Sequence, residues 1–238
     1  MVFSDTINNL GIVQQVRSFM RVDATQWPTA KIVNSSNNWL DKIAGYAIGA
    51  DRRFQWDDTN HTALPEGTTD MTINVSDYAF LTDQQGNSIV TLTGVSRLIS
   101  GSNYEPLELV DRNDVNYDPQ NFGITSGSPT QYDKIADNII RLNTKPSGTV
   151  VAGLKFFFQR TPSYFVATDT TKAPGFSPLI HRGFVIAAAY DGALTLGLAN
   201  TQALSLELQK EEAKVIQHFA IRNNDDDKRL MMKPIQFR

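Results

Sequence analysis

Ser177-Pro178-Leu179-Ile180-His181 marks the point where this chain changes from predicted strands to predicted helices. Serine is a favoured N-cap and proline a favoured first helical residue, so this stretch predicts a helix start. Apolar and small side chains then continue at helical spacing: Ile180, Phe184, Ala187, Ala188, Leu194 and Leu198. Asn200-Thr201 interrupts the series, and a second apolar series predicts another helix ending near Arg222. We therefore expect a helical hairpin.

The residues before this helix start predict β-structure. Ile139 to Leu142 and Val150 to Arg160 flank Lys145-Pro146-Ser147-Gly148, a strong turn signal, so we expect them to form a hairpin. In the second strand, Leu154, Phe156 and Phe158 share one face. Three consecutive aromatic residues could form a stacking platform for nucleic acid or sugar, but a strand covered on both faces is the favoured interpretation.

Further strands are predicted upstream, from Arg52 onward. Their residues alternate or are β-branched: Arg53–Trp56, Met71–Val75, Asp77–Leu81, Ser88–Leu92, Val95–Ile99 and Tyr104–Val110. Gln85-Gly86-Asn87 and Gly101-Ser102-Asn103 supply turns between them. These connections are too short for crossover helices, so the pattern predicts an antiparallel meander. Residues 111–130 are rich in Asp, Asn, Pro, Gly and Ser and predict a long surface loop.

The N-terminal region is predicted to be helical. Gly11 to Met20 has apolar residues at helical spacing, and a second helix begins near Pro28 with Trp39, Leu40 and Ile43 on one stripe. The predicted fold class is therefore α+β. Residues 1–51 and 177–222 form a helical bundle, residues 52–176 an inserted antiparallel β-domain, and residues 223–238 an extended C-terminal arm.

Composition limits the classes of function. The chain has 238 residues, no cysteine, three histidines and a formal net charge of −3. Disulfides, thiolate zinc sites and cysteine nucleophiles are excluded, and an acidic chain is a poor match for a protein whose main partner is bulk nucleic acid. Neither a signal-peptide pattern nor an apolar run of membrane-spanning length is found. We expect an unexported, soluble protein without a membrane partner.

The motifs that could carry chemistry are incomplete. Asp114-Val115-Asn116-Tyr117-Asp118 resembles the start of a calcium loop, but Pro119 stands where glycine is needed. Asp57-Asp58 after Trp56 could serve glycan cleavage, yet adjacent strand residues point to opposite faces. His181 and His218 lack nucleophile or ligand partners in the sequence and are interpreted as surface or interface residues. We assign no catalytic residue, metal site or cofactor.

Two motifs and their order resemble a family of tailed-phage structural proteins. Trp39-Leu40-Asp41-Lys42-Ile43 is followed by Arg53-Phe54-Gln55-Trp56-Asp57-Asp58-Thr59-Asn60. The later segments of the same pattern are Pro129 to Tyr132, Ile139 to Leu142, Phe156 to Arg160 and Pro174 to His181. In this order they resemble head-to-tail adaptor proteins, also called connector or neck proteins, which form a ring beneath the portal.

The resemblance implies a non-enzymatic virion protein, located in the neck and assembled in the host cytoplasm. Its expected partners are the portal protein, the next neck or tail protein, and further copies in a ring of roughly 12. DNA would pass through as a weakly contacted cargo. The partner-binding arm comprises Leu230, Met231, Met232, Pro234, Ile235, Phe237 and Arg238. The expected contacts between copies are Phe184, Ala188, Leu194 and Leu198.

Two alternatives remain open from the sequence. A tail-tube, collar or baseplate component of a phage would present its β-domain outward. A carbohydrate-binding or glycan-cleaving module would use Trp56, Asp57, Asp58 and surface aromatic residues.

Overall fold

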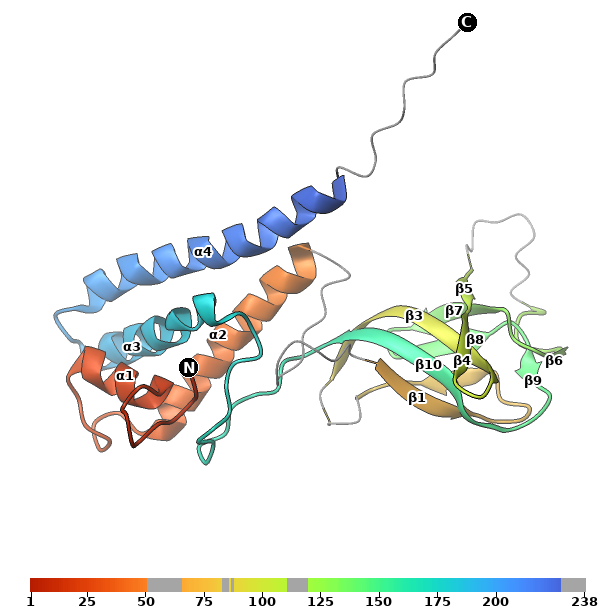
Figure 1. Cartoon of the computed structure of the whole chain (residues 1–238), viewed down its shortest axis with the longest axis horizontal. Coiled ribbons are helices and arrows are strands. Elements are labelled where there is room, and N and C mark those ends of the chain that lie inside the picture. Colours follow the sequence, from red (N-terminus) through yellow and green to blue (C-terminus); the bar gives the residue numbers. More distant parts are fainter. Residues whose placement is uncertain (51–65, 83–85, 87, 111–119, 228–238) are drawn as a thin grey trace, which may run out of the picture. The chain divides into compact units, whose positions relative to one another are not determined.

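The chain divides into two compact units, shown in Figure 1. The computed structural model describes residues 1–50, 66–82, 86, 88–110 and 120–227, with residues 50 and 221–227 described by their backbone alone. Met1–Thr62 and Pro162–Arg238 make up the first unit, here called the helical unit. Ala63–Thr161 make up the second, the strand unit. The prediction of a mixed α and β protein is confirmed.

The helical unit contains four α-helices and one short 3-10 helix among its described residues. They are α1 (Ile12–Met20), α2 (Thr29–Ala50), η1 (Pro178–Ile180), α3 (Arg182–Leu196) and α4 (Thr201–Asp227). Ser177-Pro178 opens η1 rather than α3, and the Ser177 side chain makes no capping hydrogen bond. Gly197, at φ 64°, ends α3 in the left-handed conformation that glycine adopts without strain. The backbone of α4 continues past Arg222, where the sequence predicted its end.

Helix α3 lies among α1, α2 and α4 (Figure 1). Seven consecutive residues, 183 to 189, are buried, so no face of this part of α3 meets solvent. Its small residues allow the neighbouring helices to approach. A Cβ atom on Gly183 would lie 2.8 Å from Nε1 of Trp39 on α2, and one on Gly192 would lie 3.0 Å from Cε2 of Trp27.

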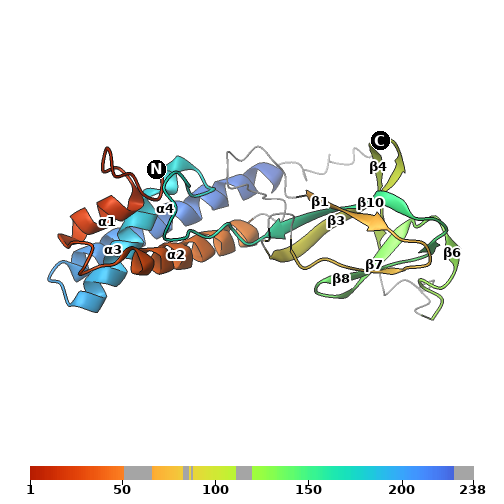
Figure 2. The same cartoon turned by 90° about the horizontal axis from the view of Figure 1, so that it is seen from below.

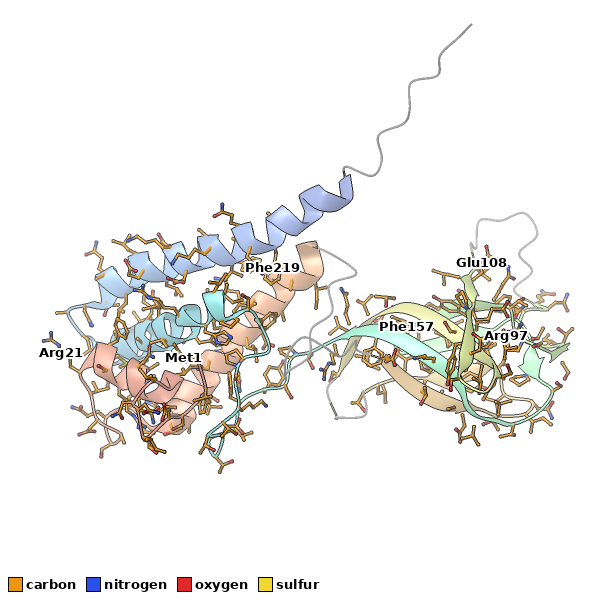
Figure 3. All side chains as sticks on the ribbon, viewed as in Figure 1. Met1, Arg21, Arg97, Glu108, Phe157 and Phe219 are labelled. Carbon is orange, nitrogen blue, oxygen red and sulfur yellow. The ribbon has the colours of Figure 1, made fainter. Side chains whose placement is uncertain are left out.

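Residues 162–176 pack with the helices, which corrects their assignment to the β-domain. Phe165 stacks on Phe3 with ring centroids 4.8 Å apart and meets Phe184 edge-on at 6.2 Å. Phe176 meets Phe219 of α4 in the same edge-on manner. Figure 3 shows Phe219 on the side of α4 that faces the other helices. The sequence contains no helical or strand period here, so only the packed aromatic rings reveal where the segment belongs.

Tyr164 also links residues 162–176 to α2 through a hydrogen bond. The hydroxyl of Tyr164 donates a 2.6 Å hydrogen bond to Oδ1 of Asp41, and Nζ of Lys172 donates to the Tyr164 carbonyl at 2.7 Å. Desolvation, together with the nearby Asp41 carboxylate, raises the pKa of Tyr164 to about 12. The proton of this hydrogen bond is therefore retained across the neutral pH range.

The strand unit has two four-stranded sheets and a two-stranded pair. Its described strands are β1 (Glu66–Met71), β2 (Asp77–Ala79), β3 (Ile89–Ser100), β4 (Asn103–Pro106), β5 (Glu108–Leu109), β6 (Ser126–Gly127), β7 (Gln131–Ala136), β8 (Ile139–Leu142), β9 (Lys145–Pro146) and β10 (Val150–Arg160). The sheet orders are β1-β10-β3-β4, β2-β8-β7-β5 and β6-β9. Figure 2 shows β3 beside β10 in the first sheet. The core between the two large sheets includes Val95, Ile140, Leu154, Phe156 and Phe158.

The strand order corrects the predicted meander. β10 pairs with β1 and β3, not with β8, whose partners are β2 and β7. The hairpin forms instead between β7 and β8, where Asp137-Asn138 fills a two-residue turn that the sequence analysis missed. β5–β7 and β6–β9 are parallel pairs. Short turns alone therefore did not determine which strands are neighbours.

Three predicted strands also differ from the structure. Ser88–Leu92 and Val95–Ile99 belong to one strand, β3, because a shift in register near Gly94 absorbs an extra residue without breaking the pairing with β10. Met71–Val75 is mainly a turn, with Asn74 at φ 60°. The Tyr78 hydroxyl stabilises that turn by accepting from the amide of Thr72 at 3.0 Å. The predicted strand Arg53–Trp56 lies outside the described residues.

We predict that Gly183→Ala lowers the free energy of unfolding by about 1–3 kcal/mol, because the added methyl group meets the rigid Trp39 ring. Urea unfolding of the purified chain measures this change. Gly45→Ala on α2 is the matched control, since a Cβ there has nothing within 4 Å and should stabilise the helix by about 0.5–1 kcal/mol. Equal stability of the two variants would contradict the close approach of α2 to α3.

We also predict a pH effect from Tyr164. Its folded-state pKa of about 12 lies above the ordinary value of 10.0, so its stabilising effect is complete below pH 10 and is lost as the pH rises toward 12. Tyr164→Phe should therefore lower stability at pH 8 by about 1 kcal/mol or less, and the difference should shrink at high pH. Thermal unfolding at pH 8 and above pH 11 tests this, and a difference that does not depend on pH would argue against it.

Candidate functional site

Part of the predicted site cannot be compared with the structure. The arm residues Leu230 to Arg238 lie outside the described residues, as do Trp56-Asp57-Asp58 and Asp114 to Asp118. The remaining candidates for contacts with other proteins lie on α3 and α4 of the helical unit.

The predicted contacts between copies need correction. Phe184 and Ala188 have no exposed surface and belong to the core of the helical unit, where a second copy cannot reach them. Leu198 is partly buried and packs against the same core. Leu194 is 60% exposed and is the one member of the predicted set that is open to a partner. The apolar spacing of α3 was read as a surface for other copies, but it reflects burial by three neighbouring helices.

Helix α4 has an apolar side facing the core. Leu204, Val215 and Phe219 are buried there, together with the carboxylate-bearing Glu211. The three apolar residues belong to the series from which the sequence predicted this helix. These buried residues occupy only the face of α4 that packs against the core.

The opposite face of α4 carries a second series that the sequence analysis did not separate from the first. It consists of Leu206, Gln209, Ala213, Ile216 and Ala220, here called the outer stripe. With 3.6 residues per turn, positions spaced alternately by three and four lie on one face. All five are exposed, Leu206 by 55% and Ile216 by 46%. A second series at 3-4 spacing, with members one or two residues after those of the first, was the signal available in the sequence.

The outer stripe contains no charged residue. The solvent-facing side of a surface helix is ordinarily charged or polar. Here the exposed face combines two large aliphatic side chains with alanine and glutamine, and the 3-4 spacing is that of a seam between two helices. Such a face can pack against another protein without burying an unpaired charge.

Cations near the outer stripe are already paired with carboxylates. Nζ of Lys210 lies 2.8 Å from Glu207, and Nζ of Lys214 lies 2.7 Å from Glu211. On the side toward α2, Glu212 lies 2.8 Å from Nζ of Lys42. The hydrogen bond from Lys42 is the main cause that holds the pKa of Glu212 below its ordinary value. These pairs leave little uncompensated positive charge for binding phosphates.

A group of aromatic and charged residues lies on the strand unit. Nζ of Lys155 is 5.3 Å from the ring centre of Tyr104 and 5.6 Å from that of Phe157, which Figure 3 labels on β10. The same ammonium group lies 2.9 Å from Glu66. Lys155 therefore covers both rings, so they offer no open platform for stacking a sugar or base. This arrangement lends no support to the carbohydrate-binding alternative.

His181 is not a surface residue, which corrects its interpretation from the sequence. It is 5% exposed. Its Nε2 lies 2.9 Å from the carbonyl oxygen of Phe176, which can only accept, so Nε2 carries the proton. Nδ1 is then free to accept from the amino group of Met1 at 3.1 Å. His181 is thus fully engaged in structural hydrogen bonds.

Within the described ranges, no group of three or more His, Cys, Asp or Glu side chains is placed to hold a metal ion. No described helix is long and apolar enough to cross a membrane. Neither a protein-family model nor a curated protein matches the chain. The exposed, uncharged outer stripe of α4 is our candidate for a functional surface on the helical unit.

The two faces of α4 predict opposite results for the same substitution. Leu204→Ala removes a core side chain and should lower the free energy of unfolding by about 2–5 kcal/mol. Leu206→Ala, two residues away, should change it by less than about 0.5 kcal/mol when measured at a concentration where the chain is monomeric. Urea unfolding of both variants checks this, and a large loss at Leu206 would place that residue in the core.

Proposed function

We propose that this chain is a head-to-tail adaptor of a tailed phage, a non-enzymatic virion protein that forms a ring beneath the portal. In this proposal, helices from both ends of the sequence form the bundle into which the antiparallel β-domain is inserted. The C-terminal arm, residues 223–238, reaches the portal or a neighbouring subunit. The order of motifs from Trp39 to His181 suggests this family, and the surface of α4 supports it.

The observation that carries the proposal is the uncharged outer stripe of α4. A ring with cyclic symmetry needs on each copy a surface that packs against the next copy. Leu206 and Ile216 supply apolar anchors for such a contact, while Ala213 and Ala220 let a neighbouring backbone come close. Paired charges flank the stripe and would lie at the polar rim of the interface.

The distribution of charge also favours an adaptor over a nucleic-acid-binding protein. Residues 63–161 carry seven Lys and Arg against eleven Asp and Glu, so the strand unit is net acidic. The lysines beside the outer stripe are paired with glutamates. A channel wall of this kind would hold DNA weakly, which suits a protein through which DNA must slide.

We predict that the double substitution Leu206→Glu and Ile216→Glu dissociates the ring, because it would bury charged groups between copies. Native mass spectrometry and electron microscopy of the purified chain would measure the loss of the assembly. Leu179→Glu is the control, since Leu179 is an 81% exposed apolar residue of η1 outside the outer stripe. Rings that persist in the double variant would refute α4 as the contact between copies.

The role in the virion has a separate test. The chain should co-purify with portal protein from phage particles, and deletion of residues 230–238 should abolish that association while the purified deletion variant remains folded. A chain that is absent from particles, or whose presence there does not depend on the arm, would rule out the proposed role.

A further inference from the structure

The strand unit contains a cavity between the edges of its two large sheets. Its volume is about 260 Å³, and it is lined by residues of β1, the β2 region and β10, including Gly67, Phe80, Leu81, Phe156 and Phe158. Phe80 and Phe156 lie 5.7 Å apart between ring centres and belong to the core. Leu81 is 62% exposed at the rim. The cavity therefore combines aromatic rings with the threonines Thr68, Thr69 and Thr82, and it can be reached from outside.

Two unpaired strand edges flank this cavity. Among the described strands, β1 pairs with β10 alone and β2 with β8 alone, so each is the last strand of its sheet. An edge strand presents free backbone N–H and C=O groups to which an extended peptide can add. Such a peptide is held along its backbone, and alternate side chains can enter a pocket. The cavity and its edges therefore suit an extended segment with apolar residues at every second position.

The charged residues of β1 and β2 indicate whether a basic or an acidic peptide segment would bind there. β1 contains Glu66 and Asp70, β2 contains Asp77, and neither strand contains a Lys or Arg residue. Glu66 is paired with Lys155 and Asp77 with Arg141, so among the described residues Asp70 is the carboxylate of these two strands without an ion pair. Its charge favours a basic segment over an acidic one.

The last residues of this chain have the matching properties. Residues 228–238 include four Lys or Arg residues and no Asp or Glu. In Pro234-Ile235-Gln236-Phe237-Arg238, the apolar Ile235 and Phe237 alternate with Gln236 and Arg238. Ile235 and Phe237 would lie on the same side of an extended chain. These eleven residues follow directly after the described end of α4 at Asp227.

We propose that the C-terminal segment of a second copy adds to the β1 or β2 edge and inserts Ile235 and Phe237 into the cavity beside Leu81. The inference rests on the proposed ring function, because it gives the arm a receptor on a neighbouring subunit. The occupant is a segment of this chain, so the contact links copies of one protein, and loss of portal association on deletion of residues 230–238 would follow from loss of this link between copies.

The test uses full-length chain with Ile235→Ser and Phe237→Ser, so that its own tail does not compete. A fluorescent peptide of residues 228–238 should bind this protein in the micromolar range, as measured by fluorescence anisotropy. A peptide with the same two serines should bind at least about tenfold more weakly, or 1.4 kcal/mol. Binding should also weaken as salt is raised, since exposed charges contribute to it.

Leu81→Glu in the receptor should reduce peptide binding by about tenfold or more. Leu109→Glu should leave it unchanged and is a matched control, because Leu109 is 57% exposed on β5, the edge strand at the other end of the same sheet. Absence of binding, or equal effects of the two substitutions, would overturn the site.

A comparison without the α4 contact decides whether the segment comes from a second copy. With Leu206→Glu and Ile216→Glu in both proteins, so that the outer stripe does not hold copies together, native mass spectrometry should show more subunits per particle for the chain with the intact tail than for the chain with Ile235→Ser and Phe237→Ser at equal concentration. If the peptide binds but these two proteins have the same mass, the segment occupies its own copy and the proposal is overturned. Absence of the chain from virions would instead refute the adaptor function while the peptide measurement stands.

Discussion

Burial of residues 183–189 of α3 on every side is the constraint on which the helical unit depends. Three helices and an aromatic segment contact α3, and its small residues determine how close they come. Gly183 faces the Trp39 ring, and Gly192 faces Trp27. Each glycine weakens the isolated helix, but it allows close packing that a larger side chain would prevent. Because residues 183–189 of α3 are enclosed, a contact of the helical unit with another protein would use the outer faces of the neighbouring helices or the exposed end of α3, where Leu194 lies.

Helix α4 is the neighbour whose surface best suits such a contact. Its inner face buries Leu204, Val215 and Phe219, while its outer stripe remains exposed and uncharged. The Lys210 and Lys214 side chains form ion pairs with glutamates of the same helix. Neither lysine therefore places an unpaired positive charge beside the outer stripe. The strand unit supplies a different kind of surface, with two edge strands beside a cavity lined by aromatic residues and threonines. We infer that one surface packs helices together and the other receives an extended segment.

Local patterns in the sequence predicted much of the helical structure and less of the strand order. Apolar spacing located α1, α2 and α4, and alternation placed Leu154, Phe156 and Phe158 on one buried face. Strand pairing depends on residues distant in sequence, so the partners of β10 did not follow from nearby turns. The predicted contacts between copies were wrong at two positions for a related reason. Phe184 and Ala188 have the spacing expected of either a core or an interface, and burial alone distinguishes the two.

Electron cryomicroscopy of the assembled full-length chain would test the central claim most directly. The account predicts a closed ring in which Leu206 and Ile216 of every copy are buried against the next copy. Monomers at all concentrations, or a ring in which the outer stripe of α4 faces solvent in every copy, would contradict it.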